Sequence, residues 1–282
     1  MRDFNEFNLT DAVLARLAEA PDPRVRQISE ALVRHLHAFV REVEPTQSEW
    51  AAGIDFLTRT GHMCDGKRQE FILLSDTLGV SMLVDAINHR RPAGATETTV
   101  LGPFYVENAP VFPLGADISA GMSGMRLFVE GTVSDVEGAP LAGAVVDVWH
   151  ADPGGTYDVQ GSGGPAGRAR FTADAAGRFH FWTVRPSFYP VPHDGPVGQM
   201  LAAQGRHPYR PAHIHFMIAS PGRETLVTHI FVDGDPYLDS DAVFGVKESI
   251  IRPFAEQPAG AAPDGTEMRE SFCRLQYDFR LK

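Results

Sequence analysis

The sequence predicts a mainly β protein with an α-helical N-terminal part. Apolar residues recur at three- and four-residue steps through about the first ninety residues, which is typical of helices. From about residue 99, short β-branched or aromatic runs alternate with turns rich in Gly and Pro. Many short strands without alternating long helices favour a sandwich or a barrel. We therefore expect a helical domain over residues 1–98 and a β-sandwich domain over residues 99–282.

Four helices are expected in the N-terminal domain. Pro21 and Pro23 end the first of them, because proline cannot continue a helix. The fourth contains Gly79, which interrupts an otherwise regular apolar periodicity. The expected helices cover about residues 12–17, 25–39, 50–61 and 67–89.

The second of these helices carries an apolar stripe on one face. The stripe consists of Val25, Ile28, Leu32, Leu36 and Phe39. Such a stripe either packs inside an ordinary α-bundle or forms a surface for a second subunit. The sequence favours neither alternative.

Short strands are expected throughout the C-terminal domain. They are rich in Val, Ile, Phe and Trp, and the first two are separated by a Gly- and Pro-containing turn at residues 138–143. The expected strands are residues 127–133, 144–150, 178–184, 214–218, 226–232 and 272–279.

Composition narrows the class of protein. The formal net charge of −11 argues against a nucleic-acid partner, because neutralising phosphates needs clustered Lys and Arg. The two cysteines, Cys64 and Cys273, form no disulfide framework and suit a reducing compartment. The N-terminus lacks the apolar core of a signal peptide, and no stretch has the length of a membrane span. We therefore expect a soluble cytoplasmic protein.

Two histidines, His213 and His215, stand one residue apart at the start of an expected strand. Side chains at i and i+2 of a strand point to the same face, so the two imidazoles would lie side by side, a chelating arrangement for a transition metal. Pro211 fits the strand entry, which leaves Arg210 at the mouth of the same site. The alternative is that both histidines are half-buried polar residues without a ligand.

Two tyrosines, Tyr157 and Tyr189, lie in loops that follow expected strands, where functional residues concentrate. A free tyrosine has a pKa of about 10, so a tyrosinate at neutral pH needs a strong Lewis acid beside it, and ferric iron is such an acid. The alternative is that both are amphipathic residues at the edge of the core. Taken alone, the spacing of these residues favours that alternative.

Several segments together resemble the intradiol ring-cleaving dioxygenases. The resemblance is carried by residues 155–157 (Gly-Thr-Tyr), by residues 188–198, which begin Phe-Tyr-Pro-Val-Pro-His-Asp-Gly, and by residues 210–215 (Arg-Pro-Ala-His-Ile-His). Residues 101–105 (Leu-Gly-Pro-Phe-Tyr) and the helical N-terminus also fit, so the resemblance spans nearly the whole chain.

Within that family, the chain is most similar to the members that cleave hydroxyquinol, benzene-1,2,4-triol. Residues 63–79, 96–104 and 237–247 carry this similarity. His229 distinguishes the chain from typical catechol-cleaving members, which have glutamine at that position.

The resemblance implies one Fe(III) per chain, held by four residues: Tyr157, Tyr189, His213 and His215. It also implies that the catalytic residues are Tyr189 and Arg210. Tyr189 would leave the metal to accept a substrate proton while Tyr157 stays bound. Arg210, always cationic, would stabilise negative charge that develops during ring cleavage.

The resemblance also implies a substrate pocket. Its expected wall consists of Leu73, Asp76, Val100, Leu101, Gly102, Pro103, Phe104, Val191, Pro192, Arg210 and Val243. An aspartate near the ring, Asp76, could hydrogen-bond the additional hydroxyl of hydroxyquinol that catechol lacks. The alternative for Asp76 is a carboxylate on a helix surface. His193, Gln199 and His229 are expected to orient the ligands by hydrogen bonds, without individual roles.

The family further implies an aromatic diol or triol and O2 as substrates, a homodimer joined through the N-terminal helices, and a bound phospholipid. The helical domain would then be the dimerisation linker and the β-sandwich the catalytic domain. The expected product from hydroxyquinol is 3-hydroxy-cis,cis-muconate, or maleylacetate. Two alternatives stay open: a catechol or chlorocatechol 1,2-dioxygenase giving a cis,cis-muconate, and a non-catalytic, transthyretin-like β-sandwich binding module.

Overall fold

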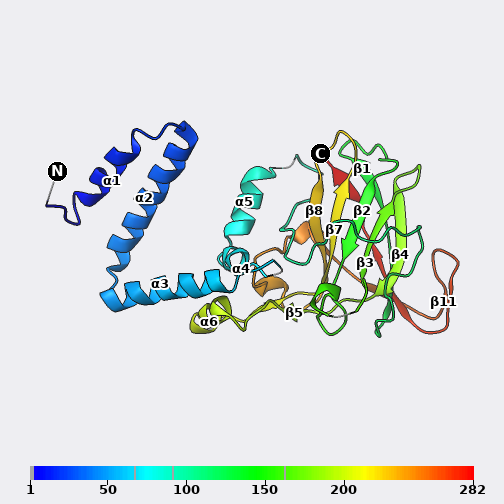
Figure 1. The fold of residues 1–282 in the computed structure, drawn as a ribbon. Helices are drawn as coiled ribbons and strands as arrows, with labels where there is room; N and C mark the ends of the chain where they lie inside the picture. Colours follow the sequence, from blue (N-terminus) through cyan, green and yellow to red (C-terminus); the bar gives the residue numbers. More distant parts are fainter. Residues whose placement is uncertain (1–2, 67, 91, 162) are drawn as a thin grey trace. The chain divides into compact units, whose positions relative to one another are not determined.

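The computed structural model describes residues 3–66, 68–90, 92–161 and 163–282, and the chain divides into two compact units, residues 1–59 and 60–282. The first unit is helical, and the second contains the sheets (Figure 1). A mainly β fold with helices in the N-terminal part was predicted, and this prediction is confirmed. In the described ranges, no helix is both long enough and apolar enough to cross a lipid bilayer.

In the first unit, α1 (Leu9–Leu17) packs on α2 (Pro23–Val43), and α3 (Gln47–His62) follows. Asp22 caps α2 by accepting hydrogen bonds from the backbone N–H groups of the first turn, and Pro23 occupies the first helical position, where its missing N–H costs nothing. Along all of α2, which is fully described, no side chain is buried, so its apolar stripe is exposed.

The expected helix over residues 67–89 is two helices in the structure, α4 (Glu70–Thr77) and α5 (Val80–Asn88). Gly79 separates them with a φ of 74°, a left-handed conformation that glycine adopts without steric cost. The prediction of one interrupted helix is therefore corrected to a complete break, and Lys67 lies outside the described residues. A further helix, α6 (Pro196–Ala203), was not expected from the sequence and begins with proline.

Two five-stranded sheets form the sandwich of the second unit. In the first sheet the order is β3-β2-β7-β8-β9. In the second it is β10-β13-β1-β14, with β4 also paired to β1. The strands of the first sheet are β2 (Val145–Trp149), β3 (Arg168–Thr172), β7 (His213–Ala219), β8 (Leu226–Val232) and β9 (Ile251–Arg252). Those of the second are β1 (Arg126–Asp135), β4 (Arg178–Val184), β10 (Ala255–Gln257), β13 (Phe272–Gln276) and β14 (Phe279–Leu281).

The remaining regular elements are short. Two-stranded pairs join β5 (Tyr189–Pro190) to β6 (Tyr209–Arg210) and β11 (Gly260–Ala261) to β12 (Glu267–Met268). Short 3-10 helices lie within the connections between strands, at Asp158–Gln160, Leu238–Ser240 and Glu248–Ile250.

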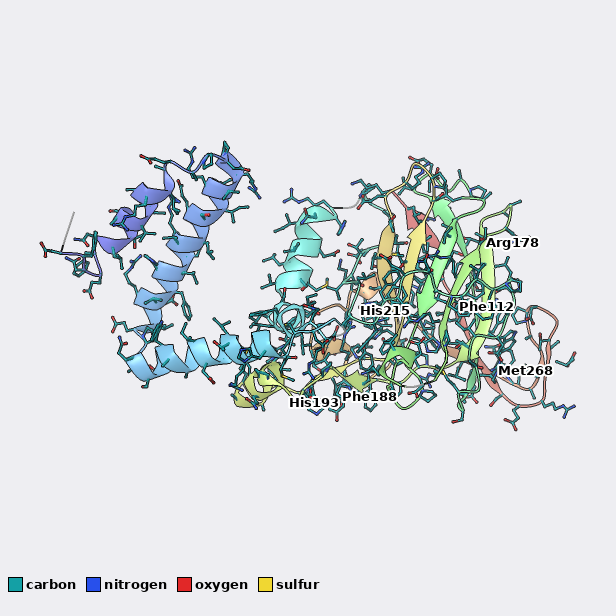
Figure 2. All side chains as sticks on the ribbon, in the orientation of Figure 1. Phe112, Arg178, Phe188, His193, His215 and Met268 are labelled. Atoms are coloured by element: carbon teal, nitrogen blue, oxygen red, sulfur yellow. The ribbon has the colours of Figure 1, made fainter. Side chains whose placement is uncertain are left out.

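The hydrophobic core lies between the two sheets and consists of inward-facing side chains from both. Figure 2 shows the side chains on the ribbon. Along β7, Ile214, Phe216 and Ile218 belong to this core. Because side chains alternate across a strand, His213 and His215 project from the opposite face of the sheet. The sandwich thus anchors β7 on one side and presents two imidazoles on the other.

Candidate active site

His213 and His215 lie side by side as the alternation of β7 predicts. Their Nε2 atoms are 3.1 Å apart, and the two residues are only 2% and 1% exposed. Nδ1 of His213 lies 2.7 Å from the carbonyl oxygen of Pro211. Since a carbonyl can only accept, Nδ1 carries the proton and Nε2 keeps a lone pair that faces the site.

Two phenol oxygens converge on the same point from separate loops. Tyr157 follows β2, and its oxygen lies 2.9 Å from Nε2 of His215. Tyr189 is on β5, and its oxygen lies 3.2 Å from that of Tyr157 and 3.5 Å from Nε2 of His213. The structure therefore brings together all four residues that were expected to hold a metal.

Burial sets the protonation states of this cluster. It lowers the pKa of both His213 and His215 well below the ordinary value, and the neighbouring positive charge of Arg210 lowers both further. Burial raises the pKa of Tyr157 well above its ordinary value, and the adjacent Tyr189 adds to the effect. Neutral imidazoles offer lone pairs, and the buried phenol of Tyr157 becomes anionic only beside a strong positive charge. This donor set fits a metal ion that is a strong Lewis acid.

His229 is a third imidazole in the cluster. It lies on β8 directly opposite His215, and one nitrogen of each of the three histidines lies within 4.8 Å of the other two. Neither ring nitrogen of His229 has a hydrogen-bond partner among the described residues, and the backbone of Val100 is near without the geometry of a hydrogen bond. The sequence pointed to His229 only as a general neighbour, because its place beside His215 depends on the register of β7 and β8.

Arg210 lies on β6 and is only 3% exposed. Its Nη1 is 3.3 Å from Nε2 of His213, and its Nε donates to a carboxylate oxygen of Asp241 at 3.1 Å. Burial opposes the charged form, but the negative charge of Asp241 and the nearby tyrosine oxygens outweigh it and raise the pKa of Arg210 above its usual value. A permanent cation therefore faces the cluster of two tyrosines and two histidines.

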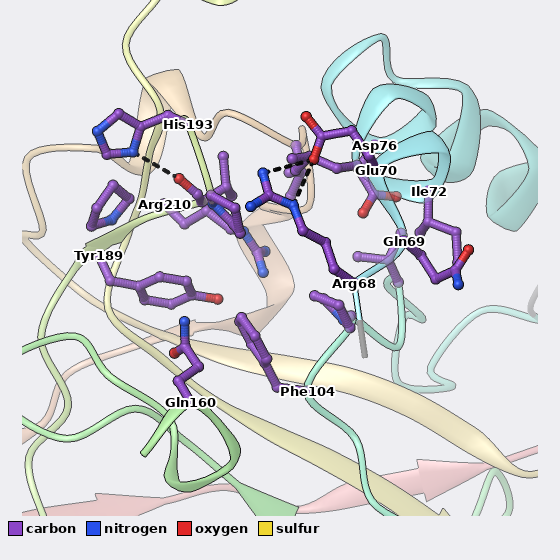
Figure 3. Close-up of a pocket in the computed structure, with 18 of the residues that line it drawn as sticks. Arg68, Gln69, Glu70, Ile72, Asp76, Phe104, Gln160, Tyr189, His193 and Arg210 are labelled. Atoms are coloured by element: carbon purple, nitrogen blue, oxygen red, sulfur yellow. Dashed lines mark hydrogen bonds and ion pairs between the residues drawn. The ribbon is translucent and has the colours of Figure 1, made fainter. Parts of the chain in front are cut away.

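A cavity of about 490 Å³ opens beside the cluster. Figure 3 shows Tyr189, Gln160 and Phe104 along one side of it and Asp76 and Glu70, both from α4, on the other. The expected wall residues that line it are Leu73, Asp76, Val100, Gly102, Pro103, Phe104, Val191, Pro192, Arg210 and Val243.

Leu101 is the exception among the expected wall residues, and that expectation is corrected. It is absent from the lining and is 39% exposed. The backbone turns at Gly102, whose φ is 77°, and Val100 and Gly102 line the cavity while the side chain of Leu101 is exposed.

Asp76 is a buried carboxylate in the cavity wall rather than a group on a helix surface. Burial raises its pKa, although Ser81 and the positive charge of Arg210 act in the opposite direction. The cavity thus contains an acid that costs free energy to ionise and that can hydrogen-bond a polar group of a ligand.

A charged cluster at the cavity was not anticipated from the sequence. Arg68 forms ion pairs with Glu70 at 2.9 Å and with Asp194 at 2.8 Å. Glu70 is fully buried and also accepts a hydrogen bond from the backbone N–H of Val197, in the first turn of α6. The cluster joins residues more than a hundred positions apart, so no local pattern could have revealed it. His193 also lines the cavity, whereas Gln199 lies on α6 and is not part of the lining.

Fold and site together define a β-sandwich protein whose clustered imidazoles and phenols can hold a metal ion beside a cavity for a small ligand. A family model described as "Dioxygenase" matches residues 100–282, and one described as "Catechol dioxygenase N terminus" matches residues 22–96. An intradiol ring-cleavage dioxygenase of Aspergillus niger is 45% identical over the full length of this chain and 86% of its own. The chain belongs to the intradiol ring-cleavage dioxygenases.

Similarity is greater to some members of this family than to others. The 6-chlorohydroxyquinol 1,2-dioxygenase of Cupriavidus pinatubonensis is 54% identical over 100% of this chain and 99% of its own. The crystal structure of hydroxyquinol 1,2-dioxygenase from Pseudomonas putida DLL-E4 is 50% identical, covers 98% of both chains and has a TM-score of 0.92. That of catechol 1,2-dioxygenase from Pseudomonas arvilla C-1 is 32% identical, covers 97% of this chain and 90% of its own, and has a TM-score of 0.82.

Proposed function

We propose that this chain cleaves hydroxyquinol with O2 between its adjacent hydroxyl-bearing carbons, giving 3-hydroxy-cis,cis-muconate or maleylacetate. The observation that carries the proposal is the convergence of two phenol oxygens and two imidazole nitrogens beside a cavity whose far wall contains a buried carboxylate. The names of the relatives that are about half identical to the chain support the choice of substrate.

Tyr157, Tyr189, His213 and His215 would hold one Fe(III) per chain. Phenol oxygens favour ferric iron over zinc or magnesium, because only a strong Lewis acid offsets the raised pKa of a buried tyrosine. When bound, the ion acidifies the hydroxyls of an aromatic diol and makes the diol reactive toward O2.

The two tyrosines differ in their access to the substrate. Tyr189 lines the cavity, whereas Tyr157 lies behind it with its ring stacked on Phe104 at 4.4 Å between centroids. Tyr189 is therefore the group that can accept a proton from a substrate hydroxyl at its phenol oxygen. Pro190 and Pro192 stiffen the segment after it and limit where its ring can move.

Arg210 supplies the fixed positive charge of the reaction. It lines the cavity, and Nη1 points toward the donor cluster. A preorganised guanidinium in a buried site stabilises negative charge that develops on the substrate without having to reorganise.

Asp76 supports the preference for a triol. A buried carboxylate that bonds an extra substrate hydroxyl disfavours an analogue without it, because the analogue desolvates the carboxylate without giving it that hydrogen bond. Leu73, Val191 and Val243 form an apolar cluster in the wall of the same cavity, which suits an aromatic ring.

A chlorinated hydroxyquinol is a second candidate substrate, favoured by the 54% identity to a relative named for 6-chlorohydroxyquinol. A halogen is apolar enough to lie against the cluster of Leu73, Val191 and Val243. Catechol and chlorocatechols are the further alternatives, and relative turnover discriminates all of them.

The test is the visible spectrum of the iron-loaded protein, with and without hydroxyquinol under anaerobic conditions, followed by turnover. We expect a broad tyrosinate-to-Fe(III) band that shifts on addition of hydroxyquinol, and a higher kcat/KM for hydroxyquinol or its 6-chloro derivative than for catechol. A protein that stays colourless after iron reconstitution would overturn the ligand assignment. Equal kcat/KM for catechol and hydroxyquinol would overturn the substrate assignment alone.

We further propose that residues 1–98 join two subunits around a bound phospholipid, and that residues 99–282 are the catalytic domain. The exposed stripe on α2 supports this, because an apolar surface of that length is costly to leave in water. The mass of the protein in solution and mass spectrometry of an organic extract test the two parts separately.

A further inference from the structure

The Arg210 guanidinium contacts His213 through Nη1, and its other nitrogens, Nε and Nη2, bind the carboxylate of Asp241. Nε of Arg210 donates to one carboxylate oxygen at 3.1 Å, and Nη2 donates to the other at 3.4 Å. Asp241 is 5% exposed, so the pair is buried on both sides. A guanidinium held through Nε and Nη2 has its remaining nitrogen, Nη1, directed the other way, and that atom lies 3.3 Å from Nε2 of His213.

The same carboxylate also orders the backbone of the next loop. One oxygen accepts the N–H of Val243 at 3.3 Å, and the other accepts the N–H of Gly245 at 2.8 Å. Val243 lines the cavity. Four hydrogen bonds therefore end on one carboxylate, two from the catalytic arginine and two from a segment of the cavity wall.

Gly245 leaves the space that this arrangement needs. A Cβ atom at this position would lie 3.1 Å from Nη2 of Arg210 and 3.2 Å from a carboxylate oxygen of Asp241. Both distances are shorter than ordinary van der Waals contact, so an added methyl group would push on the ion pair itself. The backbone of Gly245 is not left-handed, so alanine adds little strain of its own.

The orientation of Nη1 matters because Nη1 contacts Nε2 of His213, the atom that we propose binds the metal. In the structure, Nη1 donates to the lone pair on Nε2 of His213. His213 would hold a metal ion through that lone pair, and the Nη1 hydrogens would then be free to donate to a negative oxygen of the substrate. They do so only if the guanidinium keeps its position, and Asp241 is the group that fixes it.

We propose that Asp241 is a positioning residue for ring cleavage. It directs Nη1 of Arg210 toward the reacting oxygen and couples this orientation to the position of Val243 in the cavity wall. This inference rests on the proposed function, because it needs Arg210 to act on the substrate. Asp241 itself does not touch the substrate, and its effect passes through Arg210.

The test is a double-mutant cycle on kcat for hydroxyquinol, expressed per bound iron. Arg210→Met should lower kcat by about 100-fold, the usual cost of removing one group that stabilises developing charge. Asp241→Asn should lower it by about tenfold or more, because the amide nitrogen cannot accept the bonds that fix the guanidinium. In the Arg210→Met background, Asp241→Asn should change kcat by less than about twofold.

Gly245→Ala is the second variant, since it keeps both charges and disturbs only their geometry. It should lower kcat while iron content and the tyrosinate band stay at wild-type levels. Asp135→Asn is the matched control, because Asp135 is also a buried carboxylate that pairs with an arginine, Arg223 at 2.8 Å, and accepts a backbone N–H. It should lower the unfolding temperature without changing kcat.

Three results would overturn the proposal while leaving the proposed function intact. They are an unchanged kcat in Asp241→Asn, effects of Asp241→Asn and Arg210→Met that multiply, and an unchanged kcat in Gly245→Ala. If the wild-type protein turns over no aromatic diol, the proposed function fails first and this inference fails with it.

Discussion

The sandwich core and the donor cluster are equally buried and chemically opposite. In the core, Phe171 and Phe181 stack at 5.0 Å between centroids, and apolar side chains of the two sheets fill the interior. In the cluster, both nitrogens of His229 and Nδ1 of His215 are buried without a hydrogen-bond partner in the described residues. An unpaired buried polar atom lowers the free energy of unfolding by about 1–3 kcal/mol. The donor cluster therefore destabilises the fold in a way that the apolar core does not.

The difference shows what each region is for. The core is completed by atoms of this chain, and its packing is the source of stability. The cluster keeps buried polar atoms that the described residues of this chain do not satisfy, beside a set of donors that we propose holds a metal ion. Substitutions in the core should therefore change stability and not chemistry, and substitutions in the cluster should change chemistry more than stability.

The largest effect is expected for Tyr189→Phe. Removing one oxygen deletes the proposed proton acceptor, and we expect kcat to fall by about 1000-fold, within the range of general acid–base catalysis. The protein should still bind iron through Tyr157 and keep a weaker visible band. Steady-state kinetics per bound iron and the visible spectrum measure the two effects.

Tyr277→Phe is the matched control for that variant. Tyr277 belongs to the core, and its hydroxyl donates to the carbonyl oxygen of Ser249 at 3.3 Å. Its loss should cost about 1 kcal/mol of stability and leave kcat unchanged. Full activity of iron-loaded Tyr189→Phe would show that the tyrosine does not serve as the base.

Phe171→Ala should have the next effect, on stability alone. Phe171 is fully buried between the sheets, and Phe→Ala in such a position costs about 3–5 kcal/mol. Urea unfolding of the metal-free protein measures this cost, and kcat of the folded, iron-loaded fraction should stay at the wild-type value. A large fall in kcat per bound iron would mean that the core and the site are not separable.

The contrast between apolar packing and buried charge also explains which strands the sequence predicts. Strands rich in aromatic and β-branched residues were located well, and the expected range 226–232 coincides with β8. β3 was missed, because Arg168 and Arg170 break its apolar pattern. In the structure each of these charges is neutralised by an aspartate from elsewhere, Asp158 and Asp147, and such pairings are invisible to local propensity.

The site residues likewise differ in how far the sequence predicts them. His213 and His215 follow from strand alternation alone, because they are neighbours on one face. Tyr157 lies on a loop and Tyr189 on the short strand β5, and only the fold brings them together, so family resemblance was needed to select them. The pairing of Asp241 with Arg210 and that of Arg68 with Asp194 carry no local signal, since each joins residues that are far apart in the sequence.

The smallest effect is expected for substitutions of Asp76. They distinguish its contribution to substrate preference from its effect on stability. Replacing it with alanine should narrow the preference for hydroxyquinol over catechol by about tenfold to a hundredfold, because a hydrogen bond to a charged group is worth about 1.5–3 kcal/mol. The ratio of kcat/KM for the two substrates measures this. An unchanged ratio would mean that Asp76 does not contact the additional hydroxyl.

Asp76→Asn separates the charge of this residue from its shape, and its effect on stability should depend on pH. Burial raises the pKa of Asp76 in the folded protein above its ordinary value of 3.8. Folding is therefore penalised increasingly as the pH rises from 3.8 through the raised pKa of the folded carboxyl, and the penalty vanishes at pH values below 3.8, where both states are protonated. The variant should be more stable than the wild type at pH 7, and its advantage should shrink as the pH falls toward 4. A loss of stability at pH 7 would show that the carboxylate supports the fold, whereas a gain shows that it is kept for the substrate.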